Sequence, residues 1–338
     1  MSKIAWALIA VVYVCPLSHA DTPKERYVEF DYQVKLDHLP PGTAQLKIWL
    51  PIMPENDYQR IEDIEITPGY NSRLTFDKTY GNKILYYAFQ PPQAPLSIQI
   101  SYKVRRREYS SQREPNGNKP AENRKVQTSP GEDPEALERF LKPDRLVTIS
   151  PRVRELASGI TEGKMTTVAK ARAIYDYVFT HVAYDKTIPG WGRGDTERVC
   201  LIRAGNCTDF HSLFISLARA GGIPAKFVMG VPLSEKDFAE IPGYHCWAEF
   251  YDEGQGWIPV DVSEAWKNKT RYEYFFGTLN QNRLEFTQGR DIILEPSQKG
   301  EPLNYFIYPY IEADGKEFKD YSVKFQFRNG VQRISKAQ

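Results

Sequence analysis

The spacing of apolar residues changes along this chain, and the change divides it into regions of different architecture. Apolar and polar side chains alternate in four short runs, 26–36, 44–52, 82–90 and 96–104, which Pro- and Gly-rich turns separate. Strict alternation is typical of half-buried strands, and several such strands without helices predict an antiparallel sheet structure. We therefore expect an antiparallel β-sandwich domain at 25–109.

Helical spacing follows a polar stretch. Residues 110–134 are rich in Pro, Asn and Gly, which predicts a linker or exposed loop. Apolar positions then recur every three or four residues in 166–182 and again in 206–220, with a loop expected between them at 185–205. Alternation returns beyond residue 222 and continues towards the C-terminus. Helices followed by strands predict an α+β domain at 135–338, with the C-terminal strands included.

The N-terminal 20 residues have the pattern of a cleavable secretory signal. Lys3 precedes an apolar run, and the small residues of "SHA" end the segment at residue 20. Because no later segment approaches 18 consecutive apolar residues, no membrane span is expected. The sequence therefore predicts a signal peptide at 1–20 and export to the periplasm or the extracellular space.

The charge balance excludes some partners. The chain has 44 basic and 43 acidic residues, and loss of residues 1–20 removes only Lys3 among them, which leaves 43 of each. A net charge near zero argues against nucleic acid or an anionic membrane as the main partner.

The cysteine count leaves a thiol without a partner inside one chain. Of four cysteines, Cys15 lies in the predicted signal, so Cys200, Cys207 and Cys246 remain after cleavage. An odd number leaves at least one unpaired thiol in a monomer. A disulfide between Cys200 and Cys246 stays open at this point.

The position of Cys207 favours a reactive thiol. Asn206 is a good N-cap, which places Cys207 at the first position of the helix at 206–220. There the helix dipole and unpaired backbone N–H groups favour the thiolate and lower the pKa. The alternative is an inert buried cysteine that packs like a small apolar residue.

A β-hairpin is predicted after this helix. If residues 252–254 form a three-residue loop, Tyr251 pairs with Gln255 and His245 lies directly opposite Asp261. His245 and Trp247 then share one face of the strand, and Cys246 takes the other. A thiol on a helix N-terminus, a histidine and an aspartate supply a nucleophile, a base and a group that orients the base.

Two stretches resemble the transglutaminase-like superfamily with its papain-like core. They are "GNCTDFHSLFISLARAGGIPAKFVMG" and "GYHCWAEFYDEGQGWIPVDVSEA", within a region of roughly 165–290. The resemblance implies that Cys207 is the nucleophile, His245 the base and Asp261 the orienting residue. It also implies thiolate attack on an amide, either of a protein glutamine or of a peptide, with cell-wall peptides among the candidates. The attack gives a thioester that water or an amine resolves. The sandwich resembles the β-domain that precedes this core in some members.

Three further residues are candidates for lining the site or its oxyanion hole. The Cys207 N–H is expected to act with one more donor, and the resemblance offers Trp191, although its spacing to Cys207 is shorter than in animal transglutaminases. Asp209 is expected to bind backbone near the site or to lie in the first helical turn. Trp247 shares the face of His245.

No cofactor or metal is expected. Cys207 and His211 are four residues apart, as in some zinc sites, but the thiols that remain are too few for a closed site. A non-catalytic binding or scaffold module on the same core is the alternative to an enzyme. The substrate, the choice between hydrolysis and transamidation, and the oligomeric state stay open.

Overall fold

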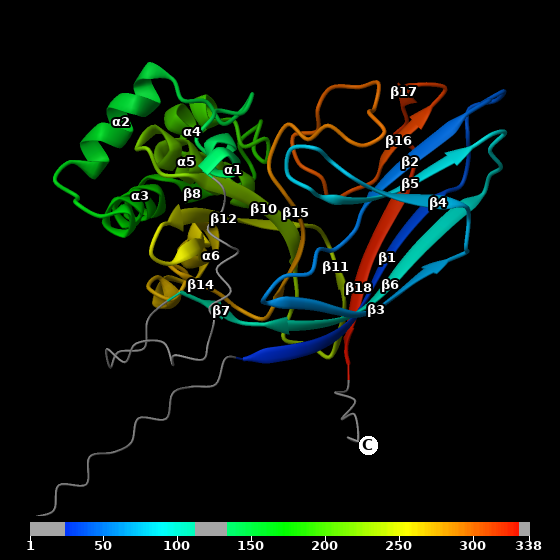
Figure 1. Cartoon of the computed structure of the whole chain (residues 1–338), viewed down its shortest axis with the longest axis horizontal. Coiled ribbons are helices and arrows are strands. Elements are labelled where there is room, and N and C mark those ends of the chain that lie inside the picture. The colour runs from blue at the N-terminus through cyan, green and yellow to red at the C-terminus, as the bar shows by residue number, and fades with distance from the viewer. Residues whose placement is uncertain (1–23, 112–133, 331–338) are drawn as a thin grey trace, which may run out of the picture.

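The computed structural model describes residues 24–111 and 134–330 (Figure 1). The expected signal peptide at 1–20 and nearly all of the expected linker at 110–134 lie outside the described residues. Among those that are described, no helix is long and apolar enough to cross a membrane.

Two antiparallel five-stranded sheets form the β-sandwich, on the right in Figure 1. In spatial order, the first contains β11 (Phe238–Ile241), β18 (Ser322–Asn329), β1 (Glu25–Leu36), β6 (Leu96–Arg107) and β3 (Gln59–Thr67). The second contains β17 (Lys316–Glu317), β16 (Tyr310–Ala313), β2 (Leu46–Pro51), β5 (Lys83–Phe89) and β4 (Ser72–Phe76). The alternating runs recognised in the sequence are β1, β2, β5 and β6.

The C-terminal strands belong to these two sheets, which corrects their predicted place in the domain at 135–338. β18 pairs with β1 along its whole length, from Val28 opposite Asn329 to Lys35 opposite Ser322. β16 likewise pairs with β2, and β11 lies at the edge beside β18. Alternation identifies a strand but not its partner, and the free edges of β1 and β2 provide backbone groups that need one. The chain therefore returns to the sandwich after building the α+β core.

The core region is a four-stranded antiparallel sheet covered by helices. Helix α5 (Cys207–Ala220) packs on the sheet and is surrounded by the other helices (Figure 1). The sheet order is β13 (Gly256–Val260), β12 (His245–Asp252), β10 (Ala225–Pro232) and β15 (Arg283–Gln288). The surrounding helices are α2 (Pro151–Thr161), α3 (Thr167–His181), α4 (Thr196–Ile202) and α6 (Val262–Lys267).

Short elements complete the fold. Helix α4 starts inside the stretch that was expected to be a loop, because Asp195 caps it by accepting the Arg198 N–H at 3.2 Å. The remaining elements are α1 (Pro134–Arg139), the 3-10 helix η1 (Lys269–Arg271), the parallel pair β8 (Ala183–Tyr184) with β9 (Ala204–Gly205), and the antiparallel pair β7 (Tyr109–Ser110) with β14 (Thr278–Leu279).

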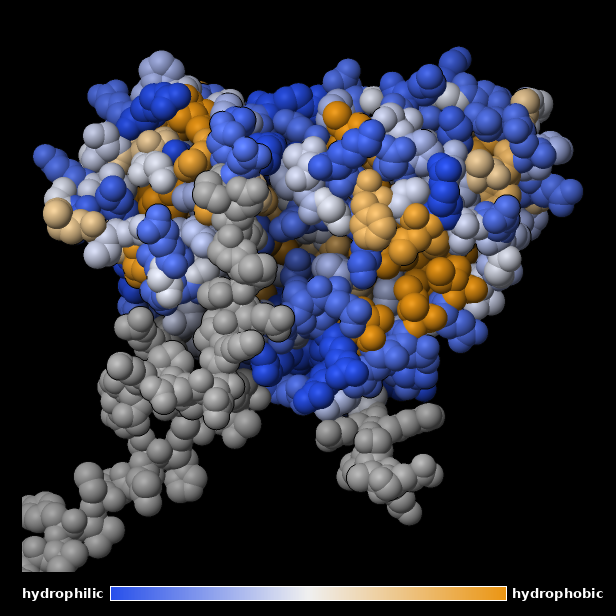
Figure 2. Space-filling view, in the orientation of Figure 1, coloured by the Kyte–Doolittle hydropathy of each residue, from blue (hydrophilic) through white to orange (hydrophobic). Residues whose placement is uncertain are grey.

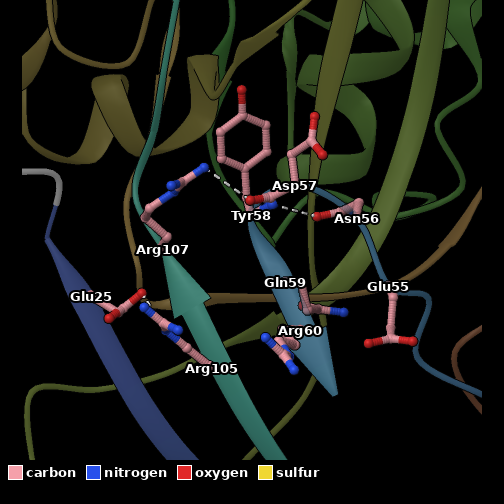
Figure 3. Close-up of a pocket in the computed structure, with 9 residues that line it drawn as sticks. All are labelled: Glu25, Glu55, Asn56, Asp57, Tyr58, Gln59, Arg60, Arg105 and Arg107. Carbon is pink, nitrogen blue, oxygen red and sulfur yellow. Dashed lines mark hydrogen bonds and ion pairs between the residues drawn. The ribbon is translucent and has the colours of Figure 1, made fainter. Parts of the chain in front are cut away.

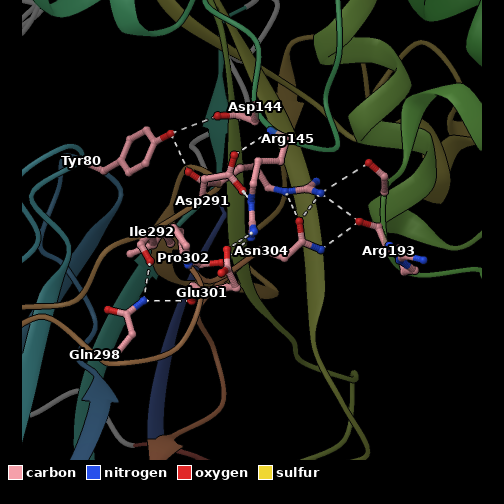
Figure 4. Close-up of polar contacts among 12 residues, drawn as sticks. Tyr80, Asp144, Arg145, Arg193, Asp291, Ile292, Gln298, Glu301, Pro302 and Asn304 are labelled. Carbon is pink, nitrogen blue, oxygen red and sulfur yellow. Dashed lines mark hydrogen bonds and ion pairs between the residues drawn. The ribbon is translucent and has the colours of Figure 1, made fainter. Parts of the chain in front are cut away.

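One apolar core joins the sandwich to the helical region. The inward row of β1 and the buried stripe of α5 belong to a single cluster of packed residues. A buried polar group also links the parts, because Asp144 forms ion pairs with Arg139 and Arg219. Asp144 also lies within hydrogen-bond reach of the Tyr80 hydroxyl from the sandwich (Figure 4). Two regions with a shared core and shared strands are expected to unfold together.

The surface in Figure 2 is mostly hydrophilic, with apolar side chains gathered over the sandwich half of the face shown. Exposed large apolar side chains of the sandwich include Ile64 on β3 and Leu74 and Phe76 on β4. These strands are the edges of the two sheets.

Cleavage between residues 112 and 133 should leave the two fragments associated. A site for a sequence-specific protease is inserted there, and the cut protein is run on gel filtration. We expect co-elution until denaturant is added, because β18 and β16 from the second fragment pair with strands of the first. A fragment starting at residue 134 that elutes alone and folded would contradict this topology.

Candidate active site

The first turn of α5 holds Cys207 in place through a reciprocal cap. The Asn206 Oδ1 atom accepts the Thr208 N–H at 2.9 Å, and the Asp209 carboxylate accepts the Asn206 N–H at 2.9 Å. This is a capping box, which satisfies N–H groups that a helix start leaves unpaired. The predicted cap is confirmed, and Cys207 occupies the first helical position at the positive end of the dipole.

Asp209 also fixes the loop that carries Trp191. Its two carboxylate oxygens accept the N–H of Gly192 at 2.6 Å and the N–H of Gly194 at 3.1 Å. From the other side, Asn304 donates to the Arg193 carbonyl at 2.9 Å (Figure 4). Gly194 has a φ of +62°, and a Cβ there would lie 2.2 Å from the Ser212 Oγ atom. Asp209 therefore binds backbone beside Cys207, one of the two roles that the sequence left open.

The hairpin has a different register from the one predicted. Tyr251 lies opposite Trp257 and not opposite Gln255, so the loop is 253–255. Gly256 has the left-handed φ of +77°, a conformation that the prediction gave to Gly254. The expected direct cross-strand pairing of His245 with Asp261 was therefore wrong by two residues. A slip of two keeps every side chain on its face of the sheet.

His245 and Asp261 nevertheless meet, because Asp261 leaves the strand and caps helix α6. The His245 Nε2 atom is 2.7 Å from Asp261 Oδ2. The other carboxylate oxygen accepts the Ser263 hydroxyl and the Glu264 N–H, both at 3.1 Å, and the Arg283 guanidinium lies 3.6 Å from Oδ2. The structure thus brings together the predicted base and its orienting residue.

Burial and charge act in opposite directions on the pKa values of this pair, and the charges outweigh burial in both. Burial opposes ionisation of Asp261, but the attraction and hydrogen bond of His245, with Arg283 and His211, hold its pKa well below the usual range. Burial also opposes protonation of His245, and Asp261 outweighs it, which raises the pKa of His245 to about 9. The imidazole is therefore protonated at neutral pH.

Cys207 completes the group. Its side chain is buried, and hydrogen bonds with Cys246 and His245 lower its pKa well below the usual range, against the effect of burial. The positive charge of His245 adds to the shift. Since His245 Nε2 is bound to Asp261, the partner for Cys207 is the other ring nitrogen, Nδ1. A thiolate and an imidazolium at the helix N-terminus form a nucleophile with its proton donor in place.

Cys246 faces α5, on the opposite side of the strand from Trp247, and forms no disulfide. Its Sγ atom is 3.8 Å from the Thr208 hydroxyl oxygen and 3.7 Å from the His211 Nδ1 atom. Cys200, Cys207 and Cys246 are all free thiols, so the Cys200–Cys246 disulfide that the sequence left open is not formed.

His211 connects the nucleophile helix to the aspartate. Its buried Nε2 atom accepts the Val262 N–H at 3.1 Å and lies 3.6 Å from Asp261 Oδ1. Burial lowers the pKa of His211 to about 4, so the ring is neutral and carries its proton on Nδ1. Sequence reasoning weighed this residue only as a zinc ligand, and in the described structure its Nε2 lone pair is taken by the backbone.

The two tryptophans differ in position. Trp191 is 39% exposed on the loop that Asp209 fixes, and the Lys186 ammonium lies 5.3 Å from its ring. Trp247 is fully buried on the sheet with Val228 and Leu279, and its indole N–H is donated to Glu249 at 3.2 Å.

A polar pocket of about 520 Å³ lies on the sandwich and not at the cysteine (Figure 3). It lies along β3 and the end of β6, and its wall mixes acidic and basic side chains with none of the three candidate catalytic residues. The lining residues are Glu25, Glu55, Asn56, Asp57, Tyr58, Gln59, Arg60, Arg105 and Arg107.

Comparisons with known proteins concern the family and the fold. Residues 154–262, about a third of the chain, match the family model of the transglutaminase-like superfamily. A crystal structure from Cytophaga hutchinsonii, named as a candidate cysteine protease, shares the fold with a TM-score of 0.58 at 16% identity, over 93% of both chains. Residues 154–262 are thus similar to the transglutaminase-like superfamily, and the chain shares its fold with this solved structure.

Two sequence relatives carry names that state no activity. A protein of Haemophilus influenzae is 27% identical over 361 residues, which cover 94% of this chain and 95% of the relative. The protein YebA of Bacillus subtilis is 28% identical over 143 residues, which cover 37% of this chain and 19% of YebA.

The pH dependence of alkylation should separate Cys207 from Cys200. At pH 6 limited iodoacetamide should modify Cys207 first, because its pKa is lowered while burial raises the pKa of Cys200. His245→Ala should move the Cys207 profile to higher pH, since it removes a hydrogen bond and a positive charge. Peptide mapping by mass spectrometry gives both profiles, and preferential labelling of Cys200 at pH 6 would refute the assignment.

Proposed function

We propose that this protein is a thiol-dependent enzyme that transfers or hydrolyses acyl groups at amide bonds of a protein or peptide. The observation that carries the proposal is the 2.7 Å contact between His245 and Asp261 beside a cysteine whose pKa is lowered at a helix N-terminus. A family fold alone supports many functions, and it is the chemistry of this site that favours acyl transfer.

The geometry supports a two-step reaction. The Cys207 thiolate attacks the amide carbonyl carbon, and the carbonyl oxygen takes the negative charge. When the carbon–nitrogen bond breaks, the His245 imidazolium gives its proton to the leaving amine, and a thioester remains on Cys207. His245, now neutral, takes a proton from water or from a second amine, which attacks the thioester and releases the thiolate.

Asp261 acts on the ring and not on the substrate. Its bond to Nε2 holds the imidazole with Nδ1 towards the sulfur and stabilises the protonated form. The hydrogen bonds that Asp261 accepts from the Ser263 hydroxyl and the Glu264 N–H keep its carboxylate turned towards the ring.

The place of action follows from the N-terminal sequence. We propose that the chain is exported through the signal at residues 1–20 and acts on a protein or peptide, with cell-wall peptides among the candidates. Attack by water would make the enzyme a hydrolase, and attack by an amine would make it a cross-linking transferase.

Triad variants test the proposal. Candidate acceptor proteins and peptides are incubated with a labelled primary amine, and mass spectrometry records both amine incorporation and hydrolysis. Cys207→Ala should abolish both, and His245→Ala should be nearly as severe, because it removes the proton donor and the base. Asp261→Asn should cost less, up to about 10⁴-fold, the loss known for a serine triad.

Cys200→Ala is the matched control and should retain full activity, because Cys200 lies on α4 away from His245. Combined triad losses should not multiply, since the three groups act as a unit. Full activity in Cys207→Ala would end the enzyme proposal and favour a binding module on the same core.

A further inference from the structure

The proposed reaction needs two hydrogen-bond donors for the carbonyl oxygen, and the helix start supplies one. The capping box takes up the N–H groups of Asn206 and Thr208, on either side of Cys207. The Cys207 N–H is thus not used by the cap and points from the helix end, where an oxyanion would lie. The second donor must lie against the same turn.

The Tyr244 hydroxyl occupies that position. Its oxygen is 3.1 Å from the Asn206 Nδ2 atom and 3.1 Å from the Thr208 Oγ1 atom, so it contacts both neighbours of Cys207. A Cβ on Gly192, in the loop fixed by Asp209, would lie 3.7 Å from this hydroxyl. Tyr244 also directly precedes His245, so the start of β12 positions the base and this hydroxyl together.

The surrounding hydrogen bonds leave the phenol proton available. The Asn206 amide can only donate to the Tyr244 oxygen. The Cys246 thiol gives its one proton to the Cys207 thiolate, and the Thr208 hydroxyl can give its own proton to the second lone pair of Tyr244. The phenol then accepts twice, and its own O–H, hydrogen-bonded to the Tyr305 hydroxyl in this structure, is the hydrogen that a substrate oxygen would take over.

The hydroxyl also stays protonated beside the thiolate. Burial raises the pKa of Tyr244, and the nearby Tyr305 and Cys207 raise it further. The rings of Tyr244 and Tyr305 are 5.3 Å apart between centroids, which fixes the phenol from its outer side.

The two tryptophans are less suited to the role. The Trp247 indole N–H is already donated to Glu249. The Trp191 ring is partly exposed and packs against Lys186, although its loop lies near Cys207.

We propose that Tyr244 is a further catalytic residue, whose O–H forms the oxyanion hole with the Cys207 N–H. This inference rests on the proposed acyl transfer. As the carbon–sulfur bond forms, the electron pair of the carbonyl double bond moves to oxygen, and this oxygen accepts both hydrogen bonds. When the pair returns and the leaving group departs, Tyr244 keeps its proton.

The test compares two reactions of the same sulfur. p-Nitrophenyl acetate acylates Cys207 through an oxyanion, with p-nitrophenolate leaving, whereas iodoacetamide alkylates it at a saturated carbon without one. Tyr244→Phe should slow acylation roughly 100- to 1,000-fold, the effect of losing one oxyanion donor, and leave alkylation unchanged. Tyr86→Phe, the same change on strand β5 of the sandwich, is the matched control and should leave both rates unchanged.

The outcomes separate this inference from the proposed function. Unchanged acylation in Tyr244→Phe overturns the inference, and so does an equal loss of alkylation, which would mean that Tyr244 only supports the fold. A loss of acylation in Trp191→Phe instead would assign the donor to Trp191. If the wild-type protein is not acylated at Cys207 at all, the proposed function itself fails.

Discussion

The buried hydrogen bond between Asp261 and His245 is the interaction on which the rest of the site depends. An isolated carboxylate at full burial is strongly unfavourable, so it needs partners of positive charge and N–H or O–H donors. Asp261 obtains them from His245, Ser263, Glu264 and the nearby Arg283. The charge that Asp261 retains keeps the imidazole protonated, and the imidazolium in turn lowers the pKa of Cys207.

Helix α5 has to satisfy polar groups inside the core as well as present the cysteine. It is buried over nearly its whole length, polar residues included. Asp209 binds the backbone of the loop that carries Trp191, and His211 binds the backbone after Asp261. The Ser212 hydroxyl accepts a hydrogen bond from the buried Arg290 guanidinium at 2.7 Å. The same helix therefore also contacts the segment that directly follows strand β15 of the core sheet. These bonds make the relative positions of helix, loop and aspartate interdependent.

The sequence predicted elements and residue types better than it predicted partners. The spacing of apolar residues and the capping residues identified β1, α3 and α5. Asn206, as the N-cap, predicted that Cys207 lies at the first position of its helix. The strand β3 was missed because a register shift between Ile61 and Asp63 breaks its alternation. Two glycines in the hairpin can each adopt a positive φ, so the loop position was ambiguous.

Contacts between distant segments had no local signal. Nothing around residue 322 indicates that β18 pairs with β1, and nothing near Arg283 places it beside Asp261. Tyr244 was not considered from the sequence, although its place directly before His245 is the one hint that the chain offers. Its contact with both neighbours of Cys207 appears only when helix and strand pack together.

The ionisation state of His245 decides whether the Asp261–His245 pair can activate Cys207. The chain has five histidines, so ¹⁵N-histidine NMR with a His245→Ala spectrum for assignment resolves this ring. We expect both ring nitrogens of His245 to carry protons at pH 7 and the ring to titrate near pH 9. A neutral His245 ring at pH 7 would contradict this expectation, because no imidazolium would then be present to stabilise the Cys207 thiolate.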